Sequence, residues 1–256
     1  MRAAIPVGLG LLWAAVVVAA VTASSLLTVA VMEPVAVVAT VSGFRASRPA
    51  RPARARRRAR NRPPVALVAA VAMCLMVPLV ALAGPYAATA GLTVGGGAVA
   101  ALVLSTGFAT SARPVRPVAA QLYAGLAPMV AVTSVVVARH QGSSLALTLV
   151  AALFAYDVGA FVMGHGRTPS GGVAGVAFGM VSVAVVAIFT AAVLDPPFSA
   201  SRPWVMFGAV AVLAALGVRL GGSVSGGERL PALRRLDSWS LAAPFWVLAT
   251  ALLLHR

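Results

Sequence analysis

The amino-acid sequence predicts an all-α fold, a polytopic transmembrane helix bundle of about nine spans. The chain is 61% hydrophobic and only 10% charged, whereas soluble domains carry roughly 25% charged residues. Its mean hydropathy is +0.97, and its apolar residues form runs of the roughly 20 residues that a membrane-spanning helix needs. Residues 1–256 are therefore expected to form a single integral membrane domain, with no room for an additional soluble one.

The first apolar block, about residues 5–44, is long enough for two closely connected helices. Small and polar residues at positions 22–25 mark the expected bend between them. Because the apolar character continues to about residue 41, far beyond the short hydrophobic core of a signal peptide, we expect this block to be retained. A single span in place of two is the alternative, and it would only move the N-terminus to the other side of the membrane.

Seven further spans follow, each an apolar run that ends near helix-breaking proline or glycine. They are expected at about residues 65–84, 91–110, 118–138, 144–163, 173–194, 203–220 and 239–254. The breakers between them are Pro63-Pro64, Gly84-Pro85, Arg113-Pro114, Pro169, Asp195-Pro196-Pro197 and Arg202-Pro203.

The distribution of arginine indicates the orientation. All 20 basic residues are arginine, and nine of them lie in the Arg-rich loop, residues 45–62. Cytoplasmic loops carry the excess of basic residues, so with nine spans this loop falls inside. The other arginines expected inside are Arg113, Arg116, Arg167, Arg219, Arg229, Arg234 and Arg235, and those expected outside are Arg139, Arg202 and Arg256. We therefore expect a multi-pass protein of the inner (plasma) membrane, with the Arg-rich loop on the cytoplasmic side.

The net charge of +15 allows two interpretations of the Arg-rich loop. One is a nucleic-acid-binding tail, and the other is a topology determinant that contacts anionic headgroups of membrane lipids. We favour the second because most of the protein surface must face lipid, so membrane lipids and no nucleic acid are the expected partners. Cys74 is the single cysteine, which excludes a disulfide framework and a Cys-based metal site.

Two acidic residues stand out among the five in the chain. Asp157 lies inside an apolar run, where an ionisable group is costly and indicates a functional site. Asp237 opens the last span. The alternatives are structural: Asp157 pairs with an arginine or lies at headgroup level, and Asp237 caps the last helix. On the expected map both carboxylates face the cytoplasmic side.

Several arginines are expected on the same side as the two carboxylates: Arg167, Arg234 and Arg235. Carboxylates bind divalent cations, and guanidinium groups bind phosphate oxygens. This combination predicts a site that handles a polyphosphate through a divalent cation, with the three arginines as phosphate contacts. For Arg234 and Arg235 a role as membrane anchors remains the alternative.

Two segments resemble a known family. Tyr156-Asp157-Val158-Gly159-Ala160-Phe161 is similar to the D-T-G-A-Y/F motif of CDP-diacylglycerol synthases (phosphatidate cytidylyltransferases). Residues 233–245, which read LRRLDSWSLAAPF, resemble the family's closing D-R-x-D-S segment and the apolar helix with A-A-P that follows it. The order and separation of the two motifs also fit. The strong resemblance runs from about residue 145 onward, and before that only the hydropathy agrees.

The resemblance implies that the protein transfers CMP from CTP to phosphatidic acid, giving CDP-diacylglycerol and pyrophosphate in phospholipid biosynthesis. It also implies a Mg²⁺ cofactor held by Asp157 and Asp237, which would be catalytic together with Arg235. Arg167, Arg234 and Arg235 would bind substrate phosphate. A homodimer and a site on the cytoplasmic side are expected on the same ground.

The chain also departs from the family pattern. Arg234 stands where the family has the first Asp of D-R-x-D, and residues 167–172 replace its S-P-K-K-T-W-E-G stretch without a Trp or a Glu. An alternative is therefore a catalytically inactive family member that acts as a membrane scaffold or as a partner of a true synthase. A small transporter is disfavoured, because four of the expected spans hold almost no polar residues.

Overall fold

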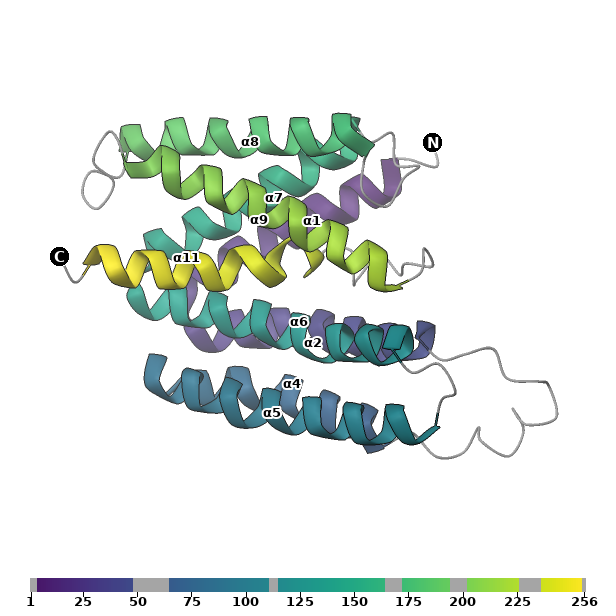
Figure 1. Ribbon diagram of the computed structural model, residues 1–256. Helices are drawn as coiled ribbons and strands as arrows, with labels where there is room; N and C mark the ends of the chain where they lie inside the picture. Colours follow the sequence, from purple (N-terminus) through teal and green to yellow (C-terminus); the bar gives the residue numbers. More distant parts are fainter. Residues whose placement is uncertain are drawn as a thin grey trace.

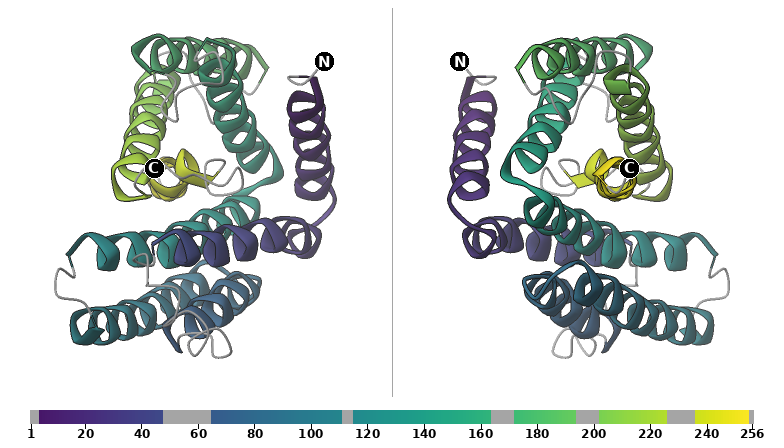
Figure 2. Two further views of the ribbon diagram at one scale, coloured as in Figure 1. Left: turned by 90° about the vertical axis from the view of Figure 1, so that its right-hand side faces the viewer. Right: turned by 90° about the vertical axis from the view of Figure 1, so that its left-hand side faces the viewer.

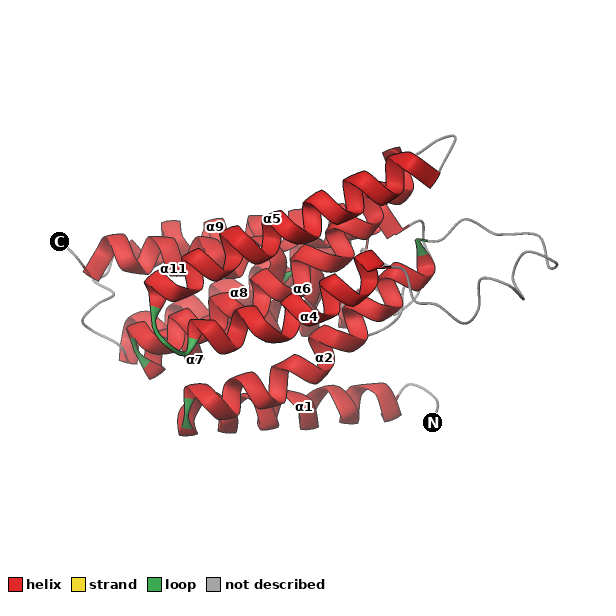
Figure 3. Cartoon of the chain, turned by 90° about the horizontal axis from the view of Figure 1, so that it is seen from below, coloured by secondary structure: helices red, strands yellow, loops and turns green. Residues whose placement is uncertain are grey.

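The structure is a computed structural model that describes residues 4–47, 65–110, 115–163, 172–193, 202–225 and 236–254. These residues form nine helices and no strand, which confirms the predicted all-α bundle (Figure 3). The helices are α1 (Ala4–Ala23), α2 (Ser25–Ala46), α4 (Val65–Ala81), α5 (Pro85–Thr110), α6 (Val115–Gln141), α7 (Ser143–Met163), α8 (Gly172–Val193), α9 (Arg202–Ser225) and α11 (Trp239–Leu254).

Most helices are long and apolar enough to cross a membrane. Within the described part of the chain six meet this condition, namely α2, α5, α6, α7, α8 and α9, and shorter apolar helices cover Leu12–Ala23, Val65–Ala81 and Trp239–Leu252. The first apolar block is two helices, as predicted. They are separated by Ser24, whose side chain caps α2 by accepting a hydrogen bond from the amide of Leu27 over 3.1 Å.

The helices are arranged around α6. It contacts α2, α4, α5, α7, α9 and α11, and most of its residues are buried. Figure 2 shows α7, α8 and α9 as an arch with α11 at its open side, and beyond it a layer of α2 and α6 followed by α4 and α5. In Figure 1 the last residues of α2, α5, α7 and α9 lie at the same end of the bundle, opposite the last residues of α11.

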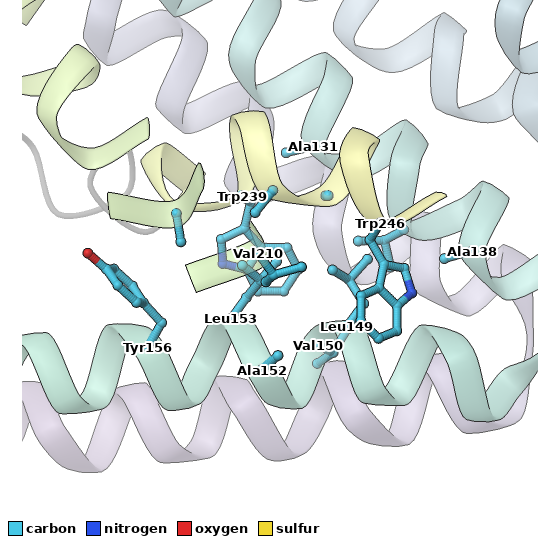
Figure 4. Close-up of a cluster of buried hydrophobic side chains, with 14 of the residues drawn as sticks. Ala131, Ala138, Leu149, Val150, Ala152, Leu153, Tyr156, Val210, Trp239 and Trp246 are labelled. Carbon is cyan, nitrogen blue, oxygen red and sulfur yellow. The ribbon is translucent and has the colours of Figure 1, made fainter. Parts of the chain in front are cut away.

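The largest hydrophobic cluster lies between the arch and α6. In Figure 4, Leu149 and Leu153 project from α7 toward Trp239 and Trp246 of α11. Leu149, Leu153 and both tryptophans are fully buried, and Phe207 of α9 meets Trp246 edge-on at 5.4 Å between ring centroids. This packing fixes the start of α11 against α7.

Hydrogen bonds connect the C-terminal ends of α1 and α6, at the end of the bundle where α11 also finishes (Figure 1). Arg139, near the end of α6, donates from Nε to the carbonyl of Val21 over 2.7 Å and from Nη2 to that of Thr22 over 3.5 Å. These carbonyls belong to the last turn of α1, where backbone acceptors lack partners within the helix. The turn between α1 and α2 is thereby attached to the end of α6.

Candidate functional site

Asp157 lies in the last two turns of α7 and is half-buried. Its Oδ1 accepts a hydrogen bond from the hydroxyl of Ser238 over 2.8 Å, across 81 positions of sequence. Ser238 is fully buried and directly precedes α11. The structure therefore brings Asp157 to the residue next to Asp237.

Asp237 is only 3% exposed. Its Oδ1 accepts a hydrogen bond from the hydroxyl of Tyr123 over 3.0 Å. Tyr123 belongs to α6, and its hydroxyl also lies 3.3 Å from the carbonyl oxygen of Gly217 in α9 and 3.3 Å from the hydroxyl of Ser240 in α11. Ser240 in turn donates to the backbone oxygen of Asp237 over 2.7 Å. Hydrogen bonds from α6 and α11 thus hold Asp237, one at its side chain and one at its backbone.

Two glycines of α9 lie against Asp237. Gly217 and Gly221 are one helical turn apart and so face the same side. A Cβ atom at Gly221 would collide with the carboxylate of Asp237, and one at Gly217 would collide with its backbone oxygen. The close approach of α9 therefore requires that these positions carry no side chain.

A second close contact positions the segment that carries Asp157. A Cβ atom at Gly159 of α7 would lie 2.8 Å from the carbonyl oxygen of Phe178, and one at Gly179 of α8 would lie 2.8 Å from the ring of Tyr156. Both glycines allow α7 and α8 to pack backbone against backbone. The motif residues Tyr156 and Gly159 thus have a packing role beside Asp157.

Three aromatic rings cover the junction of α7 and α11. Phe154 meets Trp239 edge-on, with centroids 5.5 Å apart, and meets Trp13 of α1 at 5.2 Å. Phe154 is three residues before Asp157, and Trp239 directly follows Ser238. Edge-to-face contacts of this kind add roughly 0.5–1.5 kcal/mol beyond the area they bury. These contacts fix the position of the α7 segment that carries Asp157 relative to the start of α11.

A comparison with family models gives one match, to the cytidylyltransferase family, over residues 8–225. The chain belongs to the cytidylyltransferase family. The matched range includes Asp157 and extends toward the N-terminus far beyond residue 145, where the motif resemblance begins. It ends before Asp237. A comparison with curated proteins found no significant match.

In this cytidylyltransferase family member, Arg219 of α9 is a basic residue close to the site. It is exposed and lies between Gly217 and Gly221 in sequence. Arg219 and Asp157 are both within electrostatic range of the Tyr156 hydroxyl. The sequence assigned Arg219 only a topological role. Residues two apart on a helix do not share a face, so Arg219 points away from the side of α9 that packs against Asp237, and its connection to the site is through Tyr156 of α7.

The other predicted basic residues lie outside the described part of the chain. Arg167, Arg234 and Arg235 belong to residues 164–171 and 226–235. Their predicted phosphate contacts remain predictions. Of the Arg-rich loop, the described residues include Arg45, which lies in the last turn of α2.

The chemistry of the donor atoms bears on the predicted Mg²⁺. Among the described residues no group of three His, Cys, Asp or Glu side chains comes together. Mg²⁺ does not need such a cage, because it commonly takes one or two carboxylates and completes its shell with water and substrate phosphates. The carboxylates of Asp157 and Asp237 are hard oxygen donors of the kind that Mg²⁺ prefers, and the hydroxyls of Ser238 and Tyr123 donate hydrogen bonds to them. The residues present therefore fit this ion.

Proposed function

We propose that this member of the cytidylyltransferase family is a phosphatidate cytidylyltransferase, which makes CDP-diacylglycerol and pyrophosphate from CTP and phosphatidic acid. One observation carries the proposal. The Asp157–Ser238 hydrogen bond brings the D-x-G-A-F segment of α7 to the L-D-S segment before α11. These are the two segments that resemble the motifs of phosphatidate cytidylyltransferases.

The depth of Asp157 suits a lipid phosphate. It lies six residues before the end of α7, which at 1.5 Å per residue is roughly 9 Å along the helix. A phosphate carried by a lipid headgroup reaches that level while its acyl chains stay among the exposed apolar side chains of the bundle, such as Val158 and Val162. Phosphatidic acid therefore fits as acceptor better than a water-soluble alcohol.

In the proposed reaction an oxygen of the lipid phosphate forms a bond to the α-phosphorus of CTP. The bond from this phosphorus to the bridging oxygen of the β-phosphate breaks, and pyrophosphate leaves. Such transfers depend mainly on positioning and on neutralisation of charge. Asp157 and Asp237 would hold Mg²⁺, which supplies that neutralisation when bound. Arg219, exposed at the site, supplies a guanidinium for a phosphate oxygen.

The proposed location is the inner (plasma) membrane, with the site on the cytoplasmic side. Two features support it. Arg45 ends α2 at the same end of the bundle as the last turns of α7, which carry Asp157 (Figure 1). Cytoplasmic ends of membrane helices carry the excess of arginine, and CTP is a cytoplasmic nucleotide.

The test is an assay of purified protein in lipid nanodiscs with CTP labelled at its α-phosphate. We expect label to enter the lipid when phosphatidic acid and Mg²⁺ are both present, and not when diacylglycerol replaces phosphatidic acid or EDTA is added. Asp157→Asn and Asp237→Asn should each lower kcat/KM by about 100-fold or more, because a carboxylate that carries the charge balance is lost.

Asp195→Asn is the matched control, since the sequence assigns Asp195 to a loop on the opposite side of the membrane. It should keep full activity. Equal activity of Asp157→Asn and wild-type protein would contradict the proposal.

A second candidate is a non-catalytic family member that binds substrate or a true synthase. Arg234 in place of the family's acid favours it. The same preparation separates the two proposals, because this candidate predicts binding of CTP or phosphatidic acid without any labelled lipid. The homodimer stays a prediction, which light scattering of the detergent-solubilised protein would test.

A further inference from the structure

We infer that Tyr123 of α6 is a positioning residue that orients the carboxylate of Asp237 for cation binding. The inference rests on the proposed function, because it takes Asp237 as a cation ligand. No sequence motif includes Tyr123, which lies 114 positions from Asp237. Its role follows from the hydrogen bonds of one hydroxyl group.

The hydroxyl of Tyr123 has a single proton, and three of the described residues have atoms close enough to accept it. They are Oδ1 of Asp237 at 3.0 Å, the carbonyl of Gly217 at 3.3 Å and the hydroxyl of Ser240 at 3.3 Å. A carboxylate is the strongest acceptor of the three, because a hydrogen bond to an ionised group is shorter and stronger than a neutral one. The shortest of the three contacts is the one to the carboxylate.

Ser240 completes the arrangement. Its own proton goes to the backbone oxygen of Asp237 over the shorter distance of 2.7 Å. Its oxygen then faces the hydroxyl of Tyr123 as an acceptor, so Ser240 does not compete for Oδ1 of Asp237. Tyr123 and Ser240 therefore hold different atoms of the same aspartate, one its side chain and the other its backbone.

The opposite side of the carboxylate is limited by α9. Gly221 has no side chain, and a Cβ atom there would collide with all three atoms of the carboxylate group. The group thus lies between the Tyr123 hydroxyl and the backbone of α9. A buried carboxylate is costly unless hydrogen bonds compensate for lost water, and Asp237 is 3% exposed. Tyr123 supplies such a bond and selects one orientation.

Removal of this hydroxyl leaves Asp237 charged and buried but less well oriented. Hydrogen-bond partners that orient a metal-binding carboxylate contribute about 10- to 100-fold to metal affinity. Tyr123→Phe removes one oxygen and keeps the ring in the interface between α6 and α11. We therefore expect its affinity for a divalent cation to fall by about 10- to 100-fold, with little change in the fold.

The experiment is a titration of the full-length protein in nanodiscs with Mn²⁺, a paramagnetic substitute for Mg²⁺, followed by electron paramagnetic resonance without substrate. Tyr86→Phe is the matched control, because Tyr86 is 92% exposed on α5. We expect Tyr86→Phe to bind Mn²⁺ as wild-type protein does and Tyr123→Phe to bind it 10- to 100-fold more weakly. Equal affinities of Tyr123→Phe and wild-type protein would overturn the inference.

A double-mutant cycle tests whether Tyr123 acts through Asp237. In an Asp237→Asn background, Tyr123→Phe should have no further effect on Mn²⁺ affinity. In the activity assay, Tyr123→Phe should raise the Mg²⁺ concentration needed for half-maximal rate and keep its kcat at saturating Mg²⁺. A fall in kcat that excess Mg²⁺ does not restore would overturn the inference, since it indicates a general structural defect.

A measurement on wild-type protein keeps the test independent of how the variant folds. Mn²⁺ should perturb the tyrosine ultraviolet difference spectrum of wild-type and Tyr86→Phe protein, and absence of this signal overturns the inference. The outcomes also separate the two proposals. Lipid labelling with unchanged Mn²⁺ affinity in Tyr123→Phe refutes the role of Tyr123 alone, whereas wild-type protein that neither binds Mn²⁺ nor labels lipid refutes both.

Discussion

Ser238 connects the two halves of the candidate site through one side-chain atom. Its hydroxyl donates to Asp157, and its backbone continues directly from Asp237. A hydrogen bond to a charged group contributes about 1.5–3 kcal/mol to stability, and the loss of a partner leaves a half-buried charge less compensated. A small residue therefore contributes both to the stability of the α7–α11 junction and to the spacing of the two aspartates.

Ser238→Ala should lower the free energy of unfolding by about 1–3 kcal/mol, because Oδ1 of Asp157 loses the hydrogen bond from the Ser238 hydroxyl. Thermal unfolding in detergent would measure the change. Ser105→Ala is a suitable control, since the exposed hydroxyl of Ser105 bonds only to a carbonyl of its own helix in the contacts described, that of Leu102. If both variants unfold at the same temperature, the Asp157–Ser238 bond contributes nothing to stability.

The sequence singled out Asp157 because a charge in an apolar segment is costly wherever the segment packs, and it singled out Asp237 at the start of the last span through the resemblance of residues 233–245 to a family motif. The structure adds Tyr123, which the sequence did not indicate, and the contact made by Ser238, which the sequence indicated only as the last residue of the D-R-x-D-S resemblance. Tyr123 and Ser238 are ordinary polar residues whose roles depend on contacts across 114 and 81 positions. No local pattern carries such information, and only the packing of α6 and α11 reveals it.

The helix α9 extends further than the sequence predicts. The expected span ends at residue 220, before Gly221 and Gly222, whereas the helix continues to Ser225. Glycine normally weakens a helix by about 1 kcal/mol relative to alanine. Here Gly221 faces Asp237 at a distance that excludes any side chain, so packing against the aspartate compensates for the weak helix former.

Gly221→Ala and Gly208→Ala should have opposite effects on the same helix. A methyl group at Gly208 meets nothing within 4 Å, so alanine there should keep activity and raise stability by up to about 1 kcal/mol through its better helix propensity. Alanine at Gly221 collides with the carboxylate of Asp237, so it should lower both stability and Mn²⁺ affinity. Calorimetry and the Mn²⁺ titration would measure the two effects, and equal behaviour of the variants would contradict the close packing.

The start of α5 also differs from its predicted position. The expected span begins at residue 91, but the helix begins at Pro85. Proline suits the first turn of a helix, where its missing amide proton is not needed. Thr89 and Thr93 satisfy their hydroxyls with the carbonyls of Pro85 and Thr89, four residues back. Residues 85–90, which lie outside the predicted span, are therefore compatible with helix.

Hydropathy predicted where the described helices lie in the sequence, but it did not predict which helices pack against one another. Lipid tails are as apolar as leucine, so the side of a helix that faces lipid and the side that faces protein have similar composition. The central position of α6 and the arch of α7, α8 and α9 could not be derived from the sequence for this reason. Small residues such as Gly159 and Gly217 decide how closely particular helices approach one another.

The predicted orientation can be tested with single cysteines, because Cys74 is the one native cysteine and is fully buried. In a Cys74→Ala background, Ala46→Cys at the end of α2 and Ser143→Cys at the start of α7 place exposed thiols at opposite ends of the bundle (Figure 1). A membrane-impermeant maleimide should label Ser143→Cys in right-side-out vesicles and Ala46→Cys only in inside-out ones. The reverse pattern would contradict the cytoplasmic location of the Arg-rich loop.

The one-residue connections in the bundle bear on how the protein is inserted into its membrane. Ser24 alone separates α1 from α2, and Gly142 alone separates α6 from α7. A connection of one residue is too short for the two helices of a pair to insert independently. We therefore expect each pair to enter the membrane as one unit during synthesis. Because Arg139 binds carbonyls at the end of α1, the second hairpin docks onto the first. Because the N-terminal hairpin is synthesised first, we expect it to provide the docking site for the central one.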